Sequence, residues 1–165
     1  AIVEIETYKD GRSVASARIN ATVPVRDAVA LQSDALLGYF SDATNTYRFG
    51  PPKHDVVTAR LLRADTGELI SEDFQFPAGM NLPMQRDAAV EARATHLLDG
   101  SIEVTIRSDT FLEAVRVTCD GYSTNVNYFH LPPSQERRLI FGGDGRKFQA
   151  TLEALNWTGQ LTIGI

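Results

Sequence analysis

The chain is poor in the residues that covalent or metal-based stabilisation requires. Cys119 is the single cysteine among 165 residues, which excludes an internal disulfide. The three histidines, His54, His96 and His130, are scattered, and none has the short spacing to a second His or Cys that is typical of metal sites. The sequence therefore predicts no metal site, no cofactor and a fold that is stabilised by packing.

Long apolar runs and an excess of basic charge are also missing. No segment approaches the roughly 18 consecutive apolar residues that indicate a membrane span. The 16 Lys and Arg are outnumbered by 21 Asp and Glu, so the net charge is -5, whereas proteins that bind a phosphate backbone carry clustered basic residues. We expect a soluble protein with neither a membrane nor a nucleic acid as partner.

What the sequence has in quantity is short-range alternation of apolar and polar residues. Val3 and Ile5 alternate with Glu4 and Glu6, and a second alternating run follows over residues 17–23. Asp10-Gly11, between the two runs, can supply the positive φ angles of a hairpin turn. Further strands are expected over residues 56–62, 69–76, 91–98, 101–107, 114–119, 137–141, 148–152 and 160–165. Residues 33–40 could hold one helical turn.

The alternation stops between residues 77 and 89, where two prolines, a glycine and an asparagine lie close together. Extended sequence of this kind is typical of a linker between domains. The pattern predicts an all-β fold of two immunoglobulin-like antiparallel β-sandwich units, over residues 1–82 and 83–165. The first unit shows fewer strands, and one interpretation is that it is truncated and lacks N-terminal strands.

No familiar catalytic motif is visible. The sequence has no nucleophile elbow and no glycine-rich loop that precedes a helix. Carboxylates are plentiful, but at polar positions of the predicted strands they are expected to be exposed to solvent. The five carboxylates in question are Glu4, Glu6, Glu103, Glu113 and Glu153. We therefore predict no catalytic residue.

Three aromatic side chains of the second unit are candidates for a binding surface. Tyr122, Tyr128 and Trp157 could form a platform on which a sugar ring stacks. Core packing is the competing interpretation, because large aromatic residues dominate the cores of β-sandwiches. Burial of these rings would exclude the platform.

Two longer runs carry a resemblance to a known family. Residues 45–61, NTYRFGPPKHDVVTARL, with residues 74–83, FQFPAGMNLP, resemble the penultimate accessory domain of bacterial β-mannosidases in glycoside hydrolase family two. Residues 108–141 are similar to the last domain of these enzymes, with its glycine-tyrosine turn at Gly121-Tyr122 and its step Asn127-Tyr128-Phe129 before a proline turn. Val126 departs from the pattern, because many relatives have an acidic residue there.

The resemblance implies a non-catalytic role for this chain. In that family the catalytic glutamates lie on a (β/α)8 barrel of about 250 residues that precedes these domains, so no catalytic residue is carried over to any position here. The implied partner is the catalytic domain of the same polypeptide, a retaining hydrolase of terminal β-mannosides, in a bacterial cytoplasm or periplasm. The alternatives are a carbohydrate-binding module and, more remotely, an independent small enzyme.

A rigid step near the start of the first run is a candidate docking segment. Two consecutive prolines at positions 51 and 52 remove two backbone donors and favour an extended chain along an edge or a domain junction. The side chains around this step are Tyr47, Arg48, Phe49, His54 and Asp55. They could contact the catalytic domain, and a tightly folded internal loop is the equally weighted alternative.

Overall fold

The computed structural model describes residues 1–38, 51–143 and 147–165. Contacts divide the chain into two compact units, Ala1–Asn81 and Leu82–Ile165. The all-β prediction is confirmed, with 52% of the residues in strands, 3% in helix and three antiparallel sheets. That the two units are the penultimate and last domains of a longer enzyme, divided between residues 82 and 83, stays a prediction.

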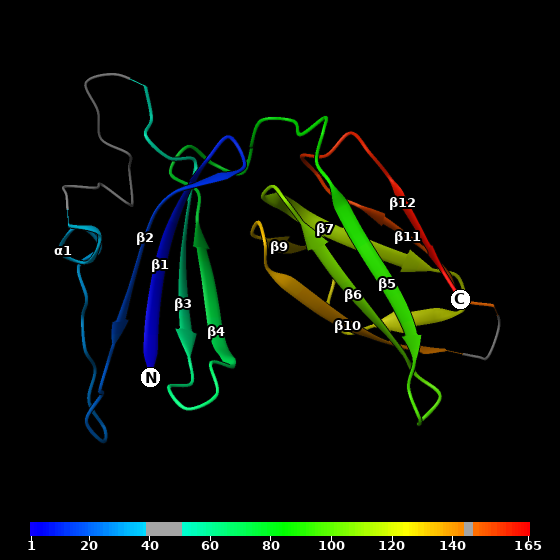
Figure 1. Ribbon diagram of the computed structural model, residues 1–165, viewed down its shortest axis with the longest axis horizontal. Coiled ribbons are helices and arrows are strands. Elements are labelled where there is room, and N and C mark those ends of the chain that lie inside the picture. The colour runs from blue at the N-terminus through cyan, green and yellow to red at the C-terminus, as the bar shows by residue number, and fades with distance from the viewer. Residues whose placement is uncertain (39–50, 144–146) are drawn as a thin grey trace. The chain divides into compact units, whose positions relative to one another are not determined.

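The first unit is built on one four-stranded antiparallel sheet in the order β2-β1-β3-β4 (Figure 1). Its strands are β1 (Ile2–Lys9), β2 (Arg12–Asn20), β3 (Val56–Leu62) and β4 (Leu69–Gln75). The predicted hairpin is present, and both turn residues have positive φ, 51° at Asp10 and 81° at Gly11. Such angles suit glycine and are tolerated by aspartate, which explains the Asp-Gly pair.

One short helix, α1 (Ser33–Leu37), follows β2. It ends at Gly38, which adopts the left-handed conformation and donates its N–H to the carbonyl of Asp34 at 3.0 Å. In the described part of the chain no helix has the length and apolar character needed to cross a bilayer.

The second unit is a sandwich of two four-stranded antiparallel sheets. One sheet has the order β5-β6-β10-β8, and the other has the order β12-β11-β7-β9 (Figure 1). This arrangement corresponds to the ABED and GFC sheets of immunoglobulin-like sandwiches, with β9 as an added edge strand. The strands are β5 (Val90–His96), β6 (Ile102–Ser108), β7 (Leu112–Cys119), β8 (Tyr122–Thr124), β9 (Phe129–Leu131), β10 (Glu136–Gly143), β11 (Gln149–Glu153) and β12 (Leu161–Gly164).

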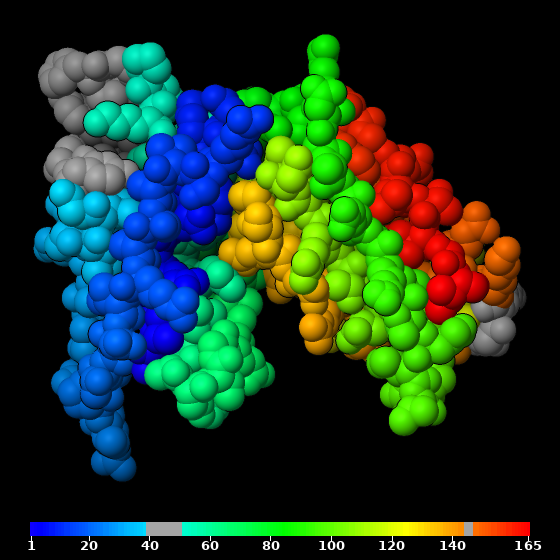
Figure 2. Space-filling model, in the orientation of Figure 1, coloured from blue at the N-terminus to red at the C-terminus, as the bar shows by residue number. Residues whose placement is uncertain are grey.

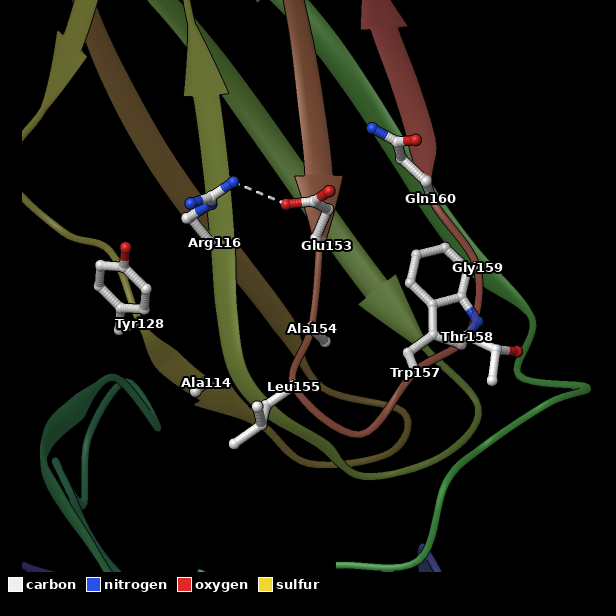
Figure 3. A pocket seen from close by; sticks show the side chains of 10 residues that line it. All are labelled: Ala114, Arg116, Tyr128, Glu153, Ala154, Leu155, Trp157, Thr158, Gly159 and Gln160. Atoms are coloured by element: carbon white, nitrogen blue, oxygen red, sulfur yellow. Dashed lines mark hydrogen bonds and ion pairs between the residues drawn. The ribbon is translucent and has the colours of Figure 1, made fainter. Parts of the chain in front are cut away.

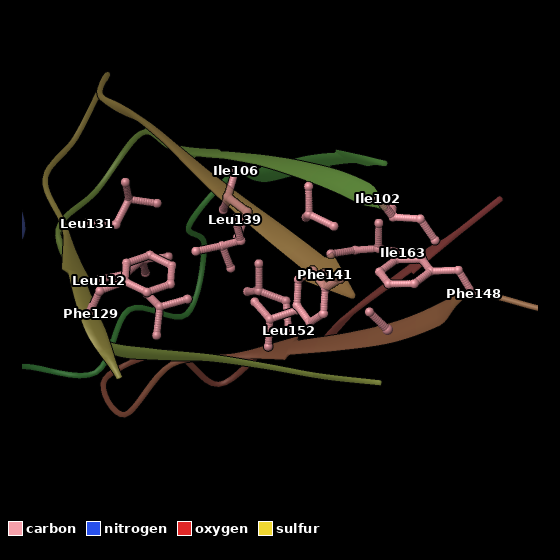
Figure 4. Close-up of a cluster of buried hydrophobic side chains, with 14 residues drawn as sticks. Ile102, Ile106, Leu112, Phe129, Leu131, Leu139, Phe141, Phe148, Leu152 and Ile163 are labelled. Atoms are coloured by element: carbon pink, nitrogen blue, oxygen red, sulfur yellow. The ribbon is translucent and has the colours of Figure 1, made fainter. Parts of the chain in front are cut away.

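The two sheets of the second unit enclose one apolar core (Figure 4). Alternate residues of strand β6 point inward, so that it contributes Ile102, Val104 and Ile106 while the residues between them are less buried. At one open side of the sandwich, β12 lies next to β5, as the red and green segments of Figure 2 show. Burial of each large apolar side chain contributes about 1.5–3 kcal/mol, so this core dominates the stability of the unit.

Strand β7 departs from strict alternation at its start. Its register against β9 shifts between Leu112 and Val115, and Ala114 has a φ of 47°. Because of this bulge, Leu112 and Glu113 are both buried, the latter with 1% exposure. The expectation that Glu113 lies on a solvated face is therefore wrong, whereas Glu4, Glu6, Glu103 and Glu153 are partly exposed.

The buried carboxylate of Glu113 accepts a hydrogen bond from the backbone N–H of Leu82 at 3.2 Å. Leu82 is the first residue of the second unit. A buried carboxyl group requires hydrogen-bond partners, and the bond from Leu82 ties the start of the chain segment that leads into β5 to strand β7.

Candidate functional site

An open groove lies on the outer face of the β12-β11-β7-β9 sheet (Figure 3). Its volume is about 610 Å³. Figure 3 shows Tyr128 on one side and Trp157 on the other, with Arg116 and Glu153 between them. The lining residues are Ala114, Arg116, Tyr128, Glu153, Ala154, Leu155, Trp157, Thr158, Gly159 and Gln160.

The floor of the groove is an ion pair across two strands. Arg116 on β7 and Glu153 on β11 are register partners, so their side chains leave the sheet on the same face. Arg116 Nη2 donates to Glu153 Oε2 at 2.8 Å. The hydroxyl of Tyr128 beside the guanidinium, and then the Glu153 carboxylate, raise the pKa of Arg116. Both side chains remain about half exposed, at 44% and 42%.

Tyr128 is turned outward by the residue before it. Asn127 pairs its side-chain amide with the backbone of Val117, accepting from the N–H at 2.8 Å and donating to the carbonyl at 3.1 Å. Tyr128 then has a φ of 56° and is 64% exposed, while Phe129 enters the core. The Asn-Tyr-Phe step is therefore an anchor, an exposed ring and a core residue in succession.

Trp157 is positioned by the connection between β11 and β12. Its indole lies against the backbone of Gly159, where an added Cβ would be 2.4 Å from Cζ2 and 2.5 Å from Cε2. Only glycine admits this close approach. The backbone N–H of Trp157 donates to the carbonyl of Ala154 at 3.2 Å, which closes the turn over residues 154–157. The ring is partly exposed along the groove.

Asn156 anchors the same connection beneath the groove. Its side chain is buried, accepts from the N–H of Glu113 at 2.7 Å and donates to the carbonyl of Phe111 at 2.9 Å. Its own carbonyl accepts from the N–H of Gln85 at 2.6 Å. The loop that carries Trp157 is thus tied to two separate parts of the second unit, the start of β7 and the segment that precedes β5.

The structure separates the three predicted aromatic residues. Tyr128 and Trp157 line one groove, whereas Tyr122 on β8 packs edge-on against Phe148, with ring centroids 5.2 Å apart, at the border of the core. Tyr122 also covers Gly143, whose absent Cβ would meet the phenol ring. Two of the three rings are therefore available to a shared ligand, and Tyr122 has the core-packing role.

The predicted docking segment is described only in part, because Tyr47, Arg48 and Phe49 lie outside the described residues. His54 is buried. The carboxylate of Asp55 accepts from Lys9 Nζ at 2.7 Å and from the N–H of Asp10 at 2.9 Å. Asp55 thus holds the β1–β2 turn, which favours the internal-loop interpretation for this residue.

Chemically, the groove is suited to binding. Among the described residues that line it, Glu153 is the one carboxylate, and hydrolysis of a glycoside by the common mechanism requires two carboxyl groups. No group of three or more His, Cys, Asp and Glu side chains that could hold a metal was found in the ranges 1–38, 51–143 and 147–165.

Sequence reasoning missed Arg116, Leu155 and Gln160, because their proximity depends on strand register.

Comparison with known proteins yields a match of fold. No protein-family model matches the chain, and no curated protein matches it. Among solved structures, a β-D-mannosidase from Dictyoglomus thermophilum superposes on 99% of this chain with a TM-score of 0.60 and 16% sequence identity. The chain spans 19% of the length of that enzyme. At this level of identity the similarity concerns the fold.

Proposed function

We propose that this chain is a non-catalytic accessory region of a β-mannosidase-type glycoside hydrolase, which supports or docks on a (β/α)8 catalytic domain of the same polypeptide. The observation that carries the proposal is the fold match, which includes both units of this chain and a small part of a much longer β-D-mannosidase.

Two further observations support the proposal. The sequence runs over residues 45–61, 74–83 and 108–141 resemble the last two domains of bacterial β-mannosidases, and they are distributed over both units. The structure explains two positions of the Asn-Tyr-Phe step in residues 108–141, since Asn127 hydrogen-bonds to Val117 and Phe129 enters the core. These positions are explained by the stability of the sandwich without any catalytic role.

The chain also lacks the space for the catalytic machinery of such an enzyme. A (β/α)8 barrel needs about 250 residues, whereas this all-β chain has 165. In the described part of the groove, a single carboxylate is held by a guanidinium and is not positioned as one of a catalytic pair. Any β-mannosidase activity is therefore assigned to the rest of the polypeptide.

The experiment is an assay of 4-nitrophenyl β-D-mannoside with two samples, the isolated chain and the complete polypeptide that carries it. We expect release of nitrophenol by the complete polypeptide and none by the isolated chain. The α-anomer of the substrate is the matched control and is expected to remain intact in both samples. Turnover of the β-mannoside by the isolated chain would refute the accessory role, as would a complete polypeptide without glycosidase activity.

Carbohydrate binding is the second candidate function, and a specific observation favours it. Tyr128 and Trp157, which the sequence singled out as a possible platform, line one groove in the structure. A binding role does not conflict with the accessory role, because a domain can support an enzyme and hold a ligand at its surface.

A further inference from the structure

We propose that the groove between Tyr128 and Trp157 is a binding site for a neutral oligosaccharide, in which the two rings stack on sugar faces and Arg116, Glu153 and Gln160 hydrogen-bond to hydroxyl groups. This site deepens the carbohydrate-binding function proposed above, on which it rests, and it does not depend on the accessory role. Its ligand is defined by chemistry: uncharged pyranose units with an apolar face and neighbouring hydroxyl groups.

The exposure of Tyr128 is the first observation that supports a binding site. A φ of 56° is uncommon for a residue with a bulky side chain, and asparagine or glycine would adopt it more easily. The fold nevertheless places a tyrosine here, with its ring 64% exposed and its hydroxyl beside Arg116. Strained positions of this kind concentrate at ligand sites. Core packing does not explain this ring, in contrast to Tyr122.

The fixed position of Trp157 is the second observation that supports a binding site. The indole is held by the close approach of Gly159, and its loop is anchored by the buried side chain of Asn156. A ring that is already fixed in the free protein loses little freedom when a ligand stacks on it. Leu155, which is 61% exposed, adds apolar surface to the same groove.

The charges in the groove select the ligand class. Arg116 and Glu153 are the charged residues among its described lining, and they neutralise each other. An acidic or basic ligand would have to break this ion pair, whereas a pair of adjacent hydroxyl groups can donate to the carboxylate and accept from the guanidinium at once. The amide of Gln160 offers a further donor and acceptor at the upper edge in Figure 3.

Size and shape agree with a short oligosaccharide. Ligand pockets usually measure about 300–1,000 Å³ and combine apolar and aromatic walls with a few polar groups. This groove, at about 610 Å³, has that composition. Because it is open at the surface and has aromatic rings on two sides, it suits a chain of several sugar units better than one enclosed sugar.

The test uses the intrinsic fluorescence of the 165-residue chain, because Trp157 is its single tryptophan and lies in the groove. The probes are β-1,4-mannotriose and cellotriose as neutral ligands and trigalacturonate as the acidic comparison. We expect a saturable change in emission with a neutral trisaccharide and a dissociation constant in the millimolar range or tighter. The acidic trisaccharide should bind at least about tenfold more weakly, a difference of 1.4 kcal/mol.

Two variants and a control locate the binding. Tyr128→Asn removes the ring and tolerates the positive φ, so it should weaken binding about tenfold or more without unfolding the chain. Gly159→Ala displaces the indole and should have a similar effect. Tyr122→Phe, outside the groove, should leave the affinity unchanged.

Several results would overturn the proposal. They are the lack of a saturable response to both neutral trisaccharides, tighter binding of trigalacturonate, and equal affinities of Tyr128→Asn and the parent chain. If neither neutral trisaccharide binds while the complete polypeptide still hydrolyses mannosides, the accessory role survives and the binding-site proposal is refuted. The two proposals therefore fail separately.

Discussion

Asn127 holds Val117 at both backbone polar groups, with the N–H of Val117 donating to Oδ1 at 2.8 Å and Nδ2 donating to its carbonyl at 3.1 Å. One side-chain amide thus replaces a rung of a β-ladder beside strand β7. It lies directly before Tyr128 and Phe129, which turn in opposite directions. The exposure of one ring and the burial of the next follow from this anchor.

Asn127 is therefore expected to contribute to stability in two separable steps. Asn127→Asp keeps the acceptor and loses the donor, so the free energy of unfolding should fall by about 1 kcal/mol. Asn127→Ala loses both contacts and should lower it by about 2 kcal/mol. Urea denaturation of the three proteins measures the series. Equal stabilities of the three proteins would show that the contact with Val117 contributes nothing.

Substitution of Asn156 should lower the stability more than substitution of Asn127, because the amide of Asn156 is buried and both of its polar atoms are paired. Asn156→Ala leaves the N–H of Glu113 and the carbonyl of Phe111 without these partners, and we expect a loss of about 2–4 kcal/mol in the free energy of unfolding. Asn125→Ala, at an exposed position, is the control and should change it by less than about 0.5 kcal/mol. Similar values for the two variants would contradict the anchoring role.

The close approach of Gly159 to Trp157 predicts a local change without global unfolding. Gly159→Ala should move the indole, shift its emission and increase its quenching by iodide, because the methyl group would occupy the space of the ring. Gly142→Ala is the matched control, since an added Cβ there has no atom within 4 Å. Identical quenching of the two variants would mean that Gly159 does not position the ring.

His130 predicts a pH dependence of stability. Burial lowers the pKa of His130 below its ordinary value, and its Nδ1 accepts a hydrogen bond from the N–H of Ala114 at 3.3 Å. The unfolded chain therefore binds this proton at a higher pH than the folded chain does. The contribution of His130 to the free energy of unfolding is therefore complete above about pH 6.5, and it is lost as the pH falls below that value.

The measurement is the melting temperature of the parent chain and of His130→Gln at pH 7.5 and pH 5. The parent chain should lose more stability than the variant over this interval, since glutamine does not titrate. His96→Gln, at an exposed position, serves as the control and should follow the parent chain. A parallel decline of the parent and His130→Gln would exclude His130 as a source of the pH dependence.

Local patterns in the sequence were sufficient for the longer strands and for the β1–β2 turn, whereas the three-residue strands β8 and β9 were not predicted. Alternation is a property of neighbouring residues, and Asp10-Gly11 carries its positive φ angles without help from the rest of the chain. The burial of Glu113 was not predictable in this way. It depends on a bulge that forms only when β7 pairs with β9, and on the donor from Leu82, 31 residues earlier.

The groove, too, could be predicted from the sequence only in part. The sequence singled out Tyr128 and Trp157 but gave Tyr122 the same weight, although Tyr122 lies against Phe148. Arg116 and Glu153 meet only through the register of β7 and β11, across 37 positions of the chain. Residue type could suggest a platform, whereas strand pairing decides which side chains share it.

The accessory role is tested most directly by association in trans. The chain and the remaining part of the polypeptide would be expressed separately and titrated against each other by calorimetry, with β-mannosidase activity and thermal stability of the remaining part followed in the same mixtures. We predict saturable one-to-one binding that raises the melting temperature of the catalytic part. No heat of binding, together with a catalytic part that is equally stable and active without this chain, would contradict the proposed function.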